Sequence, residues 1–82
     1  MIVQMSFICP ELFESVPNGQ YDLPDGGSIK LCVERCAANH GAALPEEWED
    51  RVLFLKDNKP AHADDEVADG SDIIVLRRII GG

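Results

Sequence analysis

The sequence has few basic residues and contains no long apolar run. Its 82 residues include 7 Lys and Arg against 15 Asp and Glu, which gives a net charge of −8. Nucleic acids and anionic membrane surfaces are bound mainly through Lys and Arg, so this balance argues against both kinds of partner. No stretch approaches the length of a membrane span, and the apolar start from Met1 to Pro10 lacks the basic region of a signal peptide.

Cysteines are also few, and their number, 3, is odd. Nothing in the sequence indicates secretion, so we expect reduced thiols and a cytoplasmic protein. A phosphate-binding loop is lacking, because Gly26-Gly27 has neither the Gly-x-Gly-x-x-Gly nor the Walker spacing. Internal repeats and linkers are absent too, and the length corresponds to one domain.

One cluster of potential metal ligands lies on a predicted helix. Cys32, Cys36 and His40 are four residues apart and share a helix face, and Cys9 or His62 could supply a fourth ligand. However, these positions are also needed for the only apolar stripe of the helix, and free cysteine is among the most buried residue types. We therefore expect structural cysteines and no metal site.

The apolar pattern predicts a small domain of strands around one helix. Apolar residues at spacings of three and four predict a helix over residues 29–40, with Ser28 as its N-cap and Gly41 after its end. Strands are predicted over residues 2–8, 20–23, 52–55 and from residue 73, with a short strand near 61–62. This order indicates an α+β domain in which one helix packs across a mixed sheet. In such a sheet, we expect the last strand to lie in the centre and to run parallel to the first strand.

The last strand is apolar on both sides. Ile74, Leu76 and Arg78 alternate with Ile73, Val75 and Arg77, so each set points to its own face of the sheet. A single helix covers a single face. We therefore expect Ile74 and Leu76 to form an exposed patch, which Phe54 extends if its strand lies alongside.

The strand leads into Ile79, Ile80, Gly81 and Gly82. Two glycines at a chain end form a thin tip without side chains, which can enter a narrow channel and present a carboxylate in the active site of another protein. A frayed terminus is the alternative interpretation. The apolar strand joined directly to the tip favours the first, because it would anchor and aim the tip.

The order of elements resembles the β-grasp fold of ubiquitin. Residues 57–61 and 69–72, followed by the apolar strand and Gly81-Gly82, are similar to the MoaD/ThiS sulfur carriers, which are the small subunit of molybdopterin synthase and the sulfur carrier of thiamine synthesis. Arg77-Arg78 stands where the molybdopterin synthase subunits often have prolines, and it looks more like the basic tail of ubiquitin. The resemblance implies a ubiquitin-like β-grasp domain with four to five strands over residues 1–78 and a flexible tail over 79–82.

The resemblance also implies a function. An E1-like enzyme would use ATP to adenylate the carboxylate of Gly82, next to Gly81, and a sulfur donor would convert the adenylate to a thiocarboxylate. A sulfur acceptor, such as the large subunit of molybdopterin synthase, would then receive the sulfur. This chain would be a carrier rather than an enzyme, with no bound cofactor. Its partner-binding residues would be those of the last strand and the tail, together with one from a neighbouring strand: Ile74, Leu76, Arg78, Ile79, Ile80 and Phe54.

Three alternatives remain open at this point. The chain could carry sulfur for thiamine rather than molybdopterin synthesis. It could be a ubiquitin-like modifier that is conjugated to lysines through Gly82. It could also be a β-grasp interaction module without tail chemistry.

Overall fold

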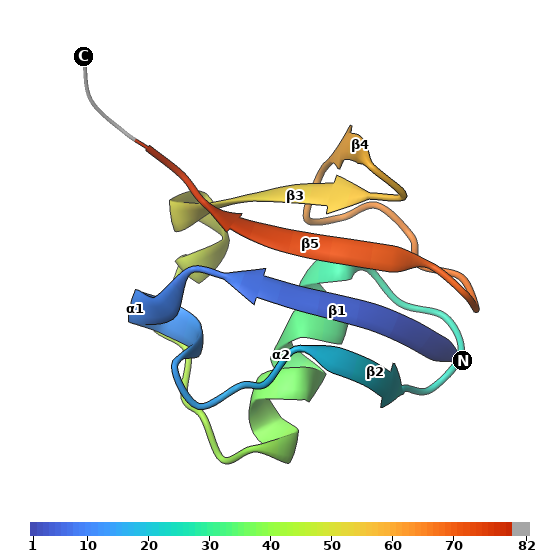
Figure 1. The fold of residues 1–82 in the computed structure, drawn as a ribbon, viewed down its shortest axis with the longest axis horizontal. Coiled ribbons are helices and arrows are strands. Elements are labelled where there is room, and N and C mark those ends of the chain that lie inside the picture. Colours follow the sequence, from blue (N-terminus) through green and yellow to red (C-terminus); the bar gives the residue numbers. More distant parts are fainter. Residues whose placement is uncertain (80–82) are drawn as a thin grey trace.

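The structure, a computed structural model, describes residues 1–79; Ile80, Gly81 and Gly82 lie outside the described residues. Its elements follow the predicted order, with two short helical turns in addition (Figure 1). They are β1 (Ile2–Ile8), α1 (Pro10–Phe13), β2 (Gly19–Asp22), α2 (Ile29–Asn39), the 3-10 turn η1 (Trp48–Arg51), β3 (Val52–Lys56), β4 (Lys59–Ala61) and β5 (Asp72–Arg77). The division into a domain over residues 1–78 and a tail over 79–82 stays a prediction.

The strands form one mixed 5-stranded sheet in the order β2-β1-β5-β3-β4 (Figure 1). β5 lies in the middle of this sheet, parallel to β1 and antiparallel to β3. The edge strands β2 and β4 each pair antiparallel with the strand beside them. The predicted α+β class, the central last strand and the parallel pairing of the first and last strands are therefore confirmed.

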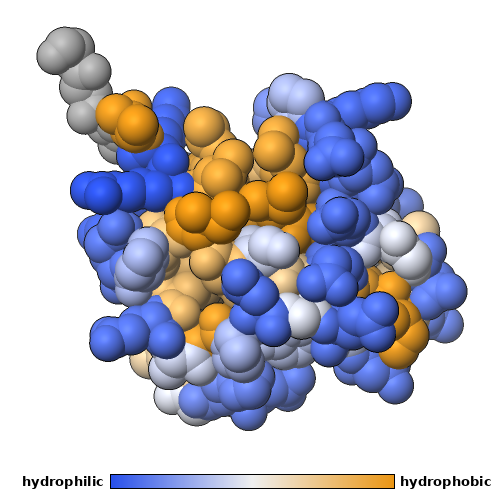
Figure 2. Space-filling view, in the orientation of Figure 1, coloured by the Kyte–Doolittle hydropathy of each residue, from blue (hydrophilic) through white to orange (hydrophobic). Residues whose placement is uncertain are grey.

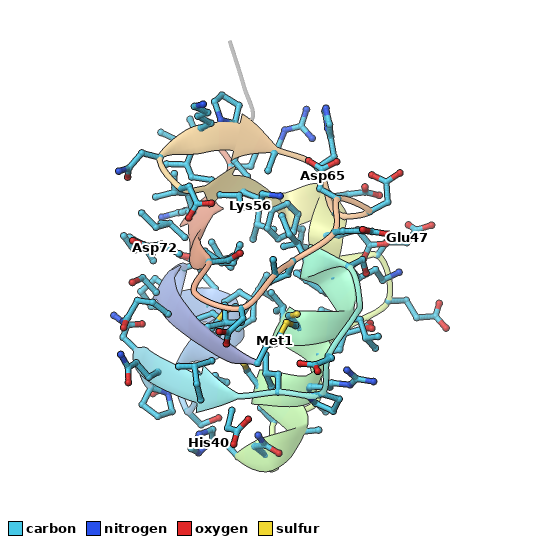
Figure 3. The ribbon with its side chains drawn as sticks, turned by 90° about the vertical axis from the view of Figure 1, so that its right-hand side faces the viewer. Met1, His40, Glu47, Lys56, Asp65 and Asp72 are labelled. Carbon is cyan, nitrogen blue, oxygen red and sulfur yellow. The ribbon has the colours of Figure 1, made fainter. Side chains whose placement is uncertain are left out.

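The main helix, α2, packs across one face of this sheet (Figure 3). It begins at the predicted N-cap, where the Ser28 hydroxyl oxygen accepts a hydrogen bond of 3.1 Å from the N–H of Leu31. The N–H groups of Ile29 and Lys30 donate to main-chain carbonyls of the acidic loop that follows β4, at 2.9 Å each. The predicted stripe is buried against the sheet and consists of Ile29, Cys32, Val33, Cys36 and Ala37. The helix ends one residue earlier than predicted, because His40 is its C-cap.

The core fills the space between α2 and the inner face of the sheet. Alternate strand residues point into it, and Val3, Met5, Ile73 and Val75 are fully buried. Trp48 closes one end of this core and is 2% exposed. Its ring stands edge-on to two phenylalanine rings, those of Phe13 and Phe54, with centroid distances of 6.1 and 6.0 Å. Trp48 is therefore a packing residue at the edge of the core.

Two local predictions need correction. No helix was predicted between the first two strands, but the structure has the helical turn α1 there, in which Pro10 occupies the first helical position. Proline suits that position, because the missing N–H would have no helical partner there. The fourth strand, Lys59–Ala61, begins earlier than expected, since Asp57 and Asn58 alone form the turn, both at positive φ (51° and 66°).

Candidate functional site

The face of the sheet that points away from α2 carries an apolar patch (Figure 2). Three of its residues lie side by side across three strands, because Leu76 of β5 pairs with Ile8 of β1 and with Leu53 of β3. In the next row, Ile74 pairs with Leu55. We call these five residues the apolar patch.

The apolar patch is accessible to a partner. Ile8 and Leu53 are 53% and 50% exposed. Leu55, Ile74 and Leu76 are half-buried, whereas Ile73 and Val75, which alternate with them on β5, have no exposed surface. The structure thus places Ile74 and Leu76 on an open face, as the alternation predicted. That they bind a partner stays a prediction.

Phe54 does not belong to this patch, and the expectation that it extends the patch was wrong. Its cross-strand neighbour on β5 is Val75, so both side chains point toward α2. Phe54 is 5% exposed and contacts Trp48. Its neighbours Leu53 and Leu55 occupy the open face instead.

A groove lies beside the apolar patch, where the chain leaves β5. We call it the exit groove; its volume is about 790 Å³. Its apolar lining comes from Ile8, Leu12, Leu76 and Ile79. Ile79 is 88% exposed, so the last described residue offers nearly its whole side chain to solvent. The exit groove and the apolar patch share Ile8 and Leu76 and therefore form one continuous surface.

The polar lining of the exit groove is mainly basic. It contains Arg51, Arg77 and Arg78, which are three of the four arginines of the chain. The pairing of β3 with β5 brings them together, because Val52 stands opposite Arg77 and the N–H of Arg78 donates to the carbonyl of Arg51 at 3.0 Å. In Figure 2, blue atoms accordingly border the orange patch on the side where β5 ends.

One carboxylate, that of Glu11 on α1, also lines the exit groove. Its Oε1 lies 3.5 Å from Nη1 of Arg77, and its Oε2 accepts a hydrogen bond of 3.0 Å from Sγ of Cys9. The thiol hydrogen bond, and then the nearby guanidinium, hold the pKa of Glu11 below its usual value. Burial, together with this carboxylate, raises the pKa of Cys9. The thiol therefore keeps its proton and acts as a donor to Glu11.

The remaining cysteines lie in the core rather than at a reactive site. Cys32 and Cys36 are fully buried on α2, and burial raises the pKa of Cys36 to about 12. His40 lies at the end of α2 (Figure 3). Its Nε2 is 3.3 Å from the hydroxyl of Tyr21. Within residues 1–79, no three histidine, cysteine or carboxylate side chains gather closely enough to hold a metal ion. A metal-free protein stays the prediction.

The predicted tail chemistry falls on residues that this geometry does not include. Gly81 and Gly82, the expected adenylation site, and Ile80, an expected partner contact, lie outside the described residues. Arg78 and Ile79 are described, and both line the exit groove. Within the described part of the chain, no helix is long and apolar enough to span a membrane.

Sequence reasoning missed several residues of this surface. Ile8 was assigned to the first strand without a face, and Leu53 was passed over in favour of Phe54. The exposed position of Ile8 could have been predicted, because alternate residues of a strand point to the same face and Ile8 alternates with the polar residues Gln4 and Ser6. Nothing in the sequence indicated that Glu11 and Arg51 lie beside the last strand.

No protein-family model matches the sequence, and no curated protein does. Solved structures do share its fold. SAMP1 from Haloferax volcanii superposes with a TM-score of 0.68 at 12% identity, over 100% of both chains. A protein of Pyrococcus furiosus assigned as molybdopterin converting factor, subunit 1, has a TM-score of 0.68 at 17% identity, over 96% of this chain and 99% of its own. H. volcanii small archaeal modifier protein 1 has a TM-score of 0.68 at 10% identity, over 95% and 98%.

These similarities establish the fold. The chain is a ubiquitin-like β-grasp domain, and its similarity to a MoaD-type protein, suggested by the sequence, is confirmed at the level of three-dimensional structure. Identities of 10–17% carry no residue assignments from one protein to another.

Proposed function

We propose that this chain is a sulfur carrier, in which Gly82 is adenylated by an E1-like enzyme and then converted to a thiocarboxylate. One observation carries the proposal: the central strand β5 carries part of an exposed apolar patch, and the chain leaves it along the exit groove at Arg78 and Ile79. In the sequence, Gly81-Gly82 follow after one more residue. A partner that binds the patch would hold the carrier by its central strand, which is paired on both sides, while the tip reacts. The fold shared with a molybdopterin converting factor subunit supports this role.

The chemistry would take place on the tail, in active sites that the partners supply. A carboxylate is a poor electrophile, so activation is needed first. Its oxygen attacks the α-phosphorus of ATP, which releases pyrophosphate and leaves an acyl-adenylate. A sulfur donor at the oxidation level of sulfide then attacks the acyl carbon, and AMP departs. Glycine suits this position, because it has no Cβ to crowd the attack.

The carrier itself would be neither an enzyme nor a cofactor protein. ATP would be bound by the activating enzyme, and the thiocarboxylate would be delivered to a sulfur acceptor comparable to the large subunit of molybdopterin synthase. The thiocarboxylate suits transport, because it is stable in water and remains nucleophilic. A thiamine-pathway acceptor would use the same tail chemistry.

A second function is favoured by two observations. The similar structures include small archaeal modifier protein 1, and Arg77-Arg78 gives the chain a basic segment before its tail. In a modifier, the activated Gly82 would form an isopeptide bond with a lysine amine of a target protein. Activation by an E1-like enzyme would be common to both functions, and only the nucleophile would differ.

Mass spectrometry of protein isolated from its native cell tests the proposal. A carrier whose chain ends at Gly82 should show a gain of about 16 Da, because one carboxylate oxygen is replaced by sulfur to give the nucleophile. Trypsin cuts after Arg78, so a modifier would instead leave Ile79–Gly82 as a branch on target lysines.

Variants that differ from the wild type only in the length of the tail provide the control for chemistry at Gly82. Purified chain should support ATP–pyrophosphate exchange by its activating enzyme. Deletion of Gly82, or one residue added after it, should abolish exchange while the melting temperature is unchanged. Exchange by either altered tail would rule out chemistry at Gly82 for both functions.

A further inference from the structure

The charge of this protein is unevenly distributed around the exit groove. The chain carries a net charge of −8, yet three of its four arginines meet where the chain leaves β5. We call Arg51, Arg77 and Arg78 the arginine collar. Glu47 and Asp65 belong to loops on the α2 side of the sheet (Figure 3). The segment of Glu47 continues to Asp50, next to Arg51, but the one carboxylate in the lining of the exit groove is that of Glu11. The exit groove is therefore a basic site on an acidic protein.

Two members of the arginine collar are placed side by side without a balancing carboxylate. The backbone of Arg78 is hydrogen-bonded to that of Arg51, which fixes the two residues on neighbouring chain segments. Among residues 1–79, no carboxylate lies within 4.0 Å of either guanidinium; Nη1 of Arg78 reaches only the main-chain carbonyl of Asp50, at 3.5 Å. Like charges that are held on neighbouring chain segments repel each other in the free protein. A carboxylate from outside would relieve this repulsion.

The third member already has a carboxylate, and it comes from the protein itself. Glu11 lies 3.5 Å from Arg77, and the Cys9 thiol orients its other oxygen. Both ends of this ion pair are accessible, since the Arg77 and Glu11 side chains are 68% and 49% exposed. A partner carboxylate could therefore replace Glu11 without unfolding any part of the domain.

We infer that the exit groove binds a partner surface in which an apolar side chain is flanked by carboxylates, and that Glu11 acts as an internal competitor for this surface. The inference rests on the proposed function, because the partner is the activating enzyme and the carboxylates surround the channel that admits the tail. The partner's apolar side chain contacts Ile8, Leu12 and Leu76, and its carboxylates contact the arginine collar.

The charges give this surface a kinetic role. Complementary charges around a binding site raise the association rate constant, and salt screens the effect. Because the arginine collar surrounds the start of the tail, attraction to an acidic channel orients the carrier with its tail toward the enzyme. Glu11 opposes this attraction, so its removal accelerates binding.

Stopped-flow association with the enzyme that supports ATP–pyrophosphate exchange tests the inference on the full-length chain. Arg51→Glu and Arg78→Glu should each lower the association rate constant about tenfold at low salt, within the range attributed to electrostatic steering. Lys59→Glu makes the same change of charge at the start of β4, away from the exit groove, and should change the rate less than about twofold. Glu11→Gln should raise it about twofold or more. The differences should shrink at high salt.

The outcomes separate this inference from the proposed function. Suppose that Arg51→Glu and Lys59→Glu have equal association rate constants and that the wild type supports ATP–pyrophosphate exchange. The arginine collar would then not bind the partner's carboxylates, and the proposed tail chemistry would be unaffected. A slower rate for Glu11→Gln would overturn the competitor role, provided that its melting temperature matches the wild type. Absence of exchange by the wild type would instead reject the proposed function itself.

Discussion

Adjacent residues of β5 should respond in opposite ways to substitution, because they point to opposite faces of the sheet. Val75 has no exposed surface and packs toward α2, whereas Leu76 is half-buried in the apolar patch. Leu76→Ser should weaken binding to the activating enzyme and leave the domain folded. Val75→Ala, on the neighbouring position of the same strand, should destabilise the domain.

The magnitudes follow from burial. Val75→Ala removes the equivalent of two buried methylenes at about 0.8 kcal/mol each and leaves a small cavity, for a cost of about 2 kcal/mol. Leu76→Ser loses two cross-strand contacts, with Ile8 and with Leu53, which are worth about 0.2–1 kcal/mol each and about 1 kcal/mol together. For a domain of this size, 1 kcal/mol shifts the melting temperature by about 4–8 °C. Val75→Ala should therefore lower it by about 8–16 °C, and Leu76→Ser by less than about 8 °C.

Circular dichroism melts and isothermal titration with the activating enzyme measure the two effects separately. Leu76→Ser should cost about 1–3 kcal/mol of binding free energy, the scale of a truncated hot-spot residue. Val75→Ala, measured well below its melting temperature, should bind like the wild type. If Leu76→Ser destabilises the domain as much as Val75→Ala, the assignment of faces is wrong. If it folds and binds normally, the apolar patch is not the docking surface.

Two further predictions concern stability. Burial, and then the neighbouring Cys32, raise the pKa of Cys36 from 9.0 to about 12, so the folded state holds this proton more tightly than the unfolded chain does. The resulting stabilisation is complete below pH 9 and is lost as the pH rises toward 12. In urea unfolding, the free energy of unfolding should fall by up to about 1.4 kcal/mol per pH unit in this range. The fall should be shallower in Cys36→Ala. Asn58 has a φ of 66°, so Asn58→Ala should cost about 1 kcal/mol in the same measurement, whereas Asn58→Gly should cost none, and equal losses would contradict the turn geometry.

Much of the fold was predictable, because its elements follow simple periodicities. The stripe of α2 and its Ser28 cap were visible in the sequence, and the apolar length of β5 indicated a central position. The face of β3 was not predictable, since Val52, Leu53, Phe54 and Leu55 are all apolar and carry no alternation. Only the pairing of Phe54 with Val75 decides which of them is buried.

The exit groove was less predictable than the fold, because it joins segments that are distant in the sequence. Pro10 follows the first predicted strand by two residues, and in the structure it begins α1, which carries Glu11 to the side of β5. Arg51 reaches Arg78 through the antiparallel pairing of β3 and β5. A single sequence contains no local signal for such a meeting of charges.

The position of β5 also affects how the protein is made. β5 is the last strand of this sheet to be synthesised, yet it is the central strand, and β1 and β3 both pair with it. A nascent chain that stops before residue 72 leaves two unpaired strand edges and an uncovered half of the core, and such surfaces attract chaperones and proteases. Incomplete chains would therefore be removed before they could compete for a partner. A molecule that has folded has therefore also synthesised the strand that leads into its tail.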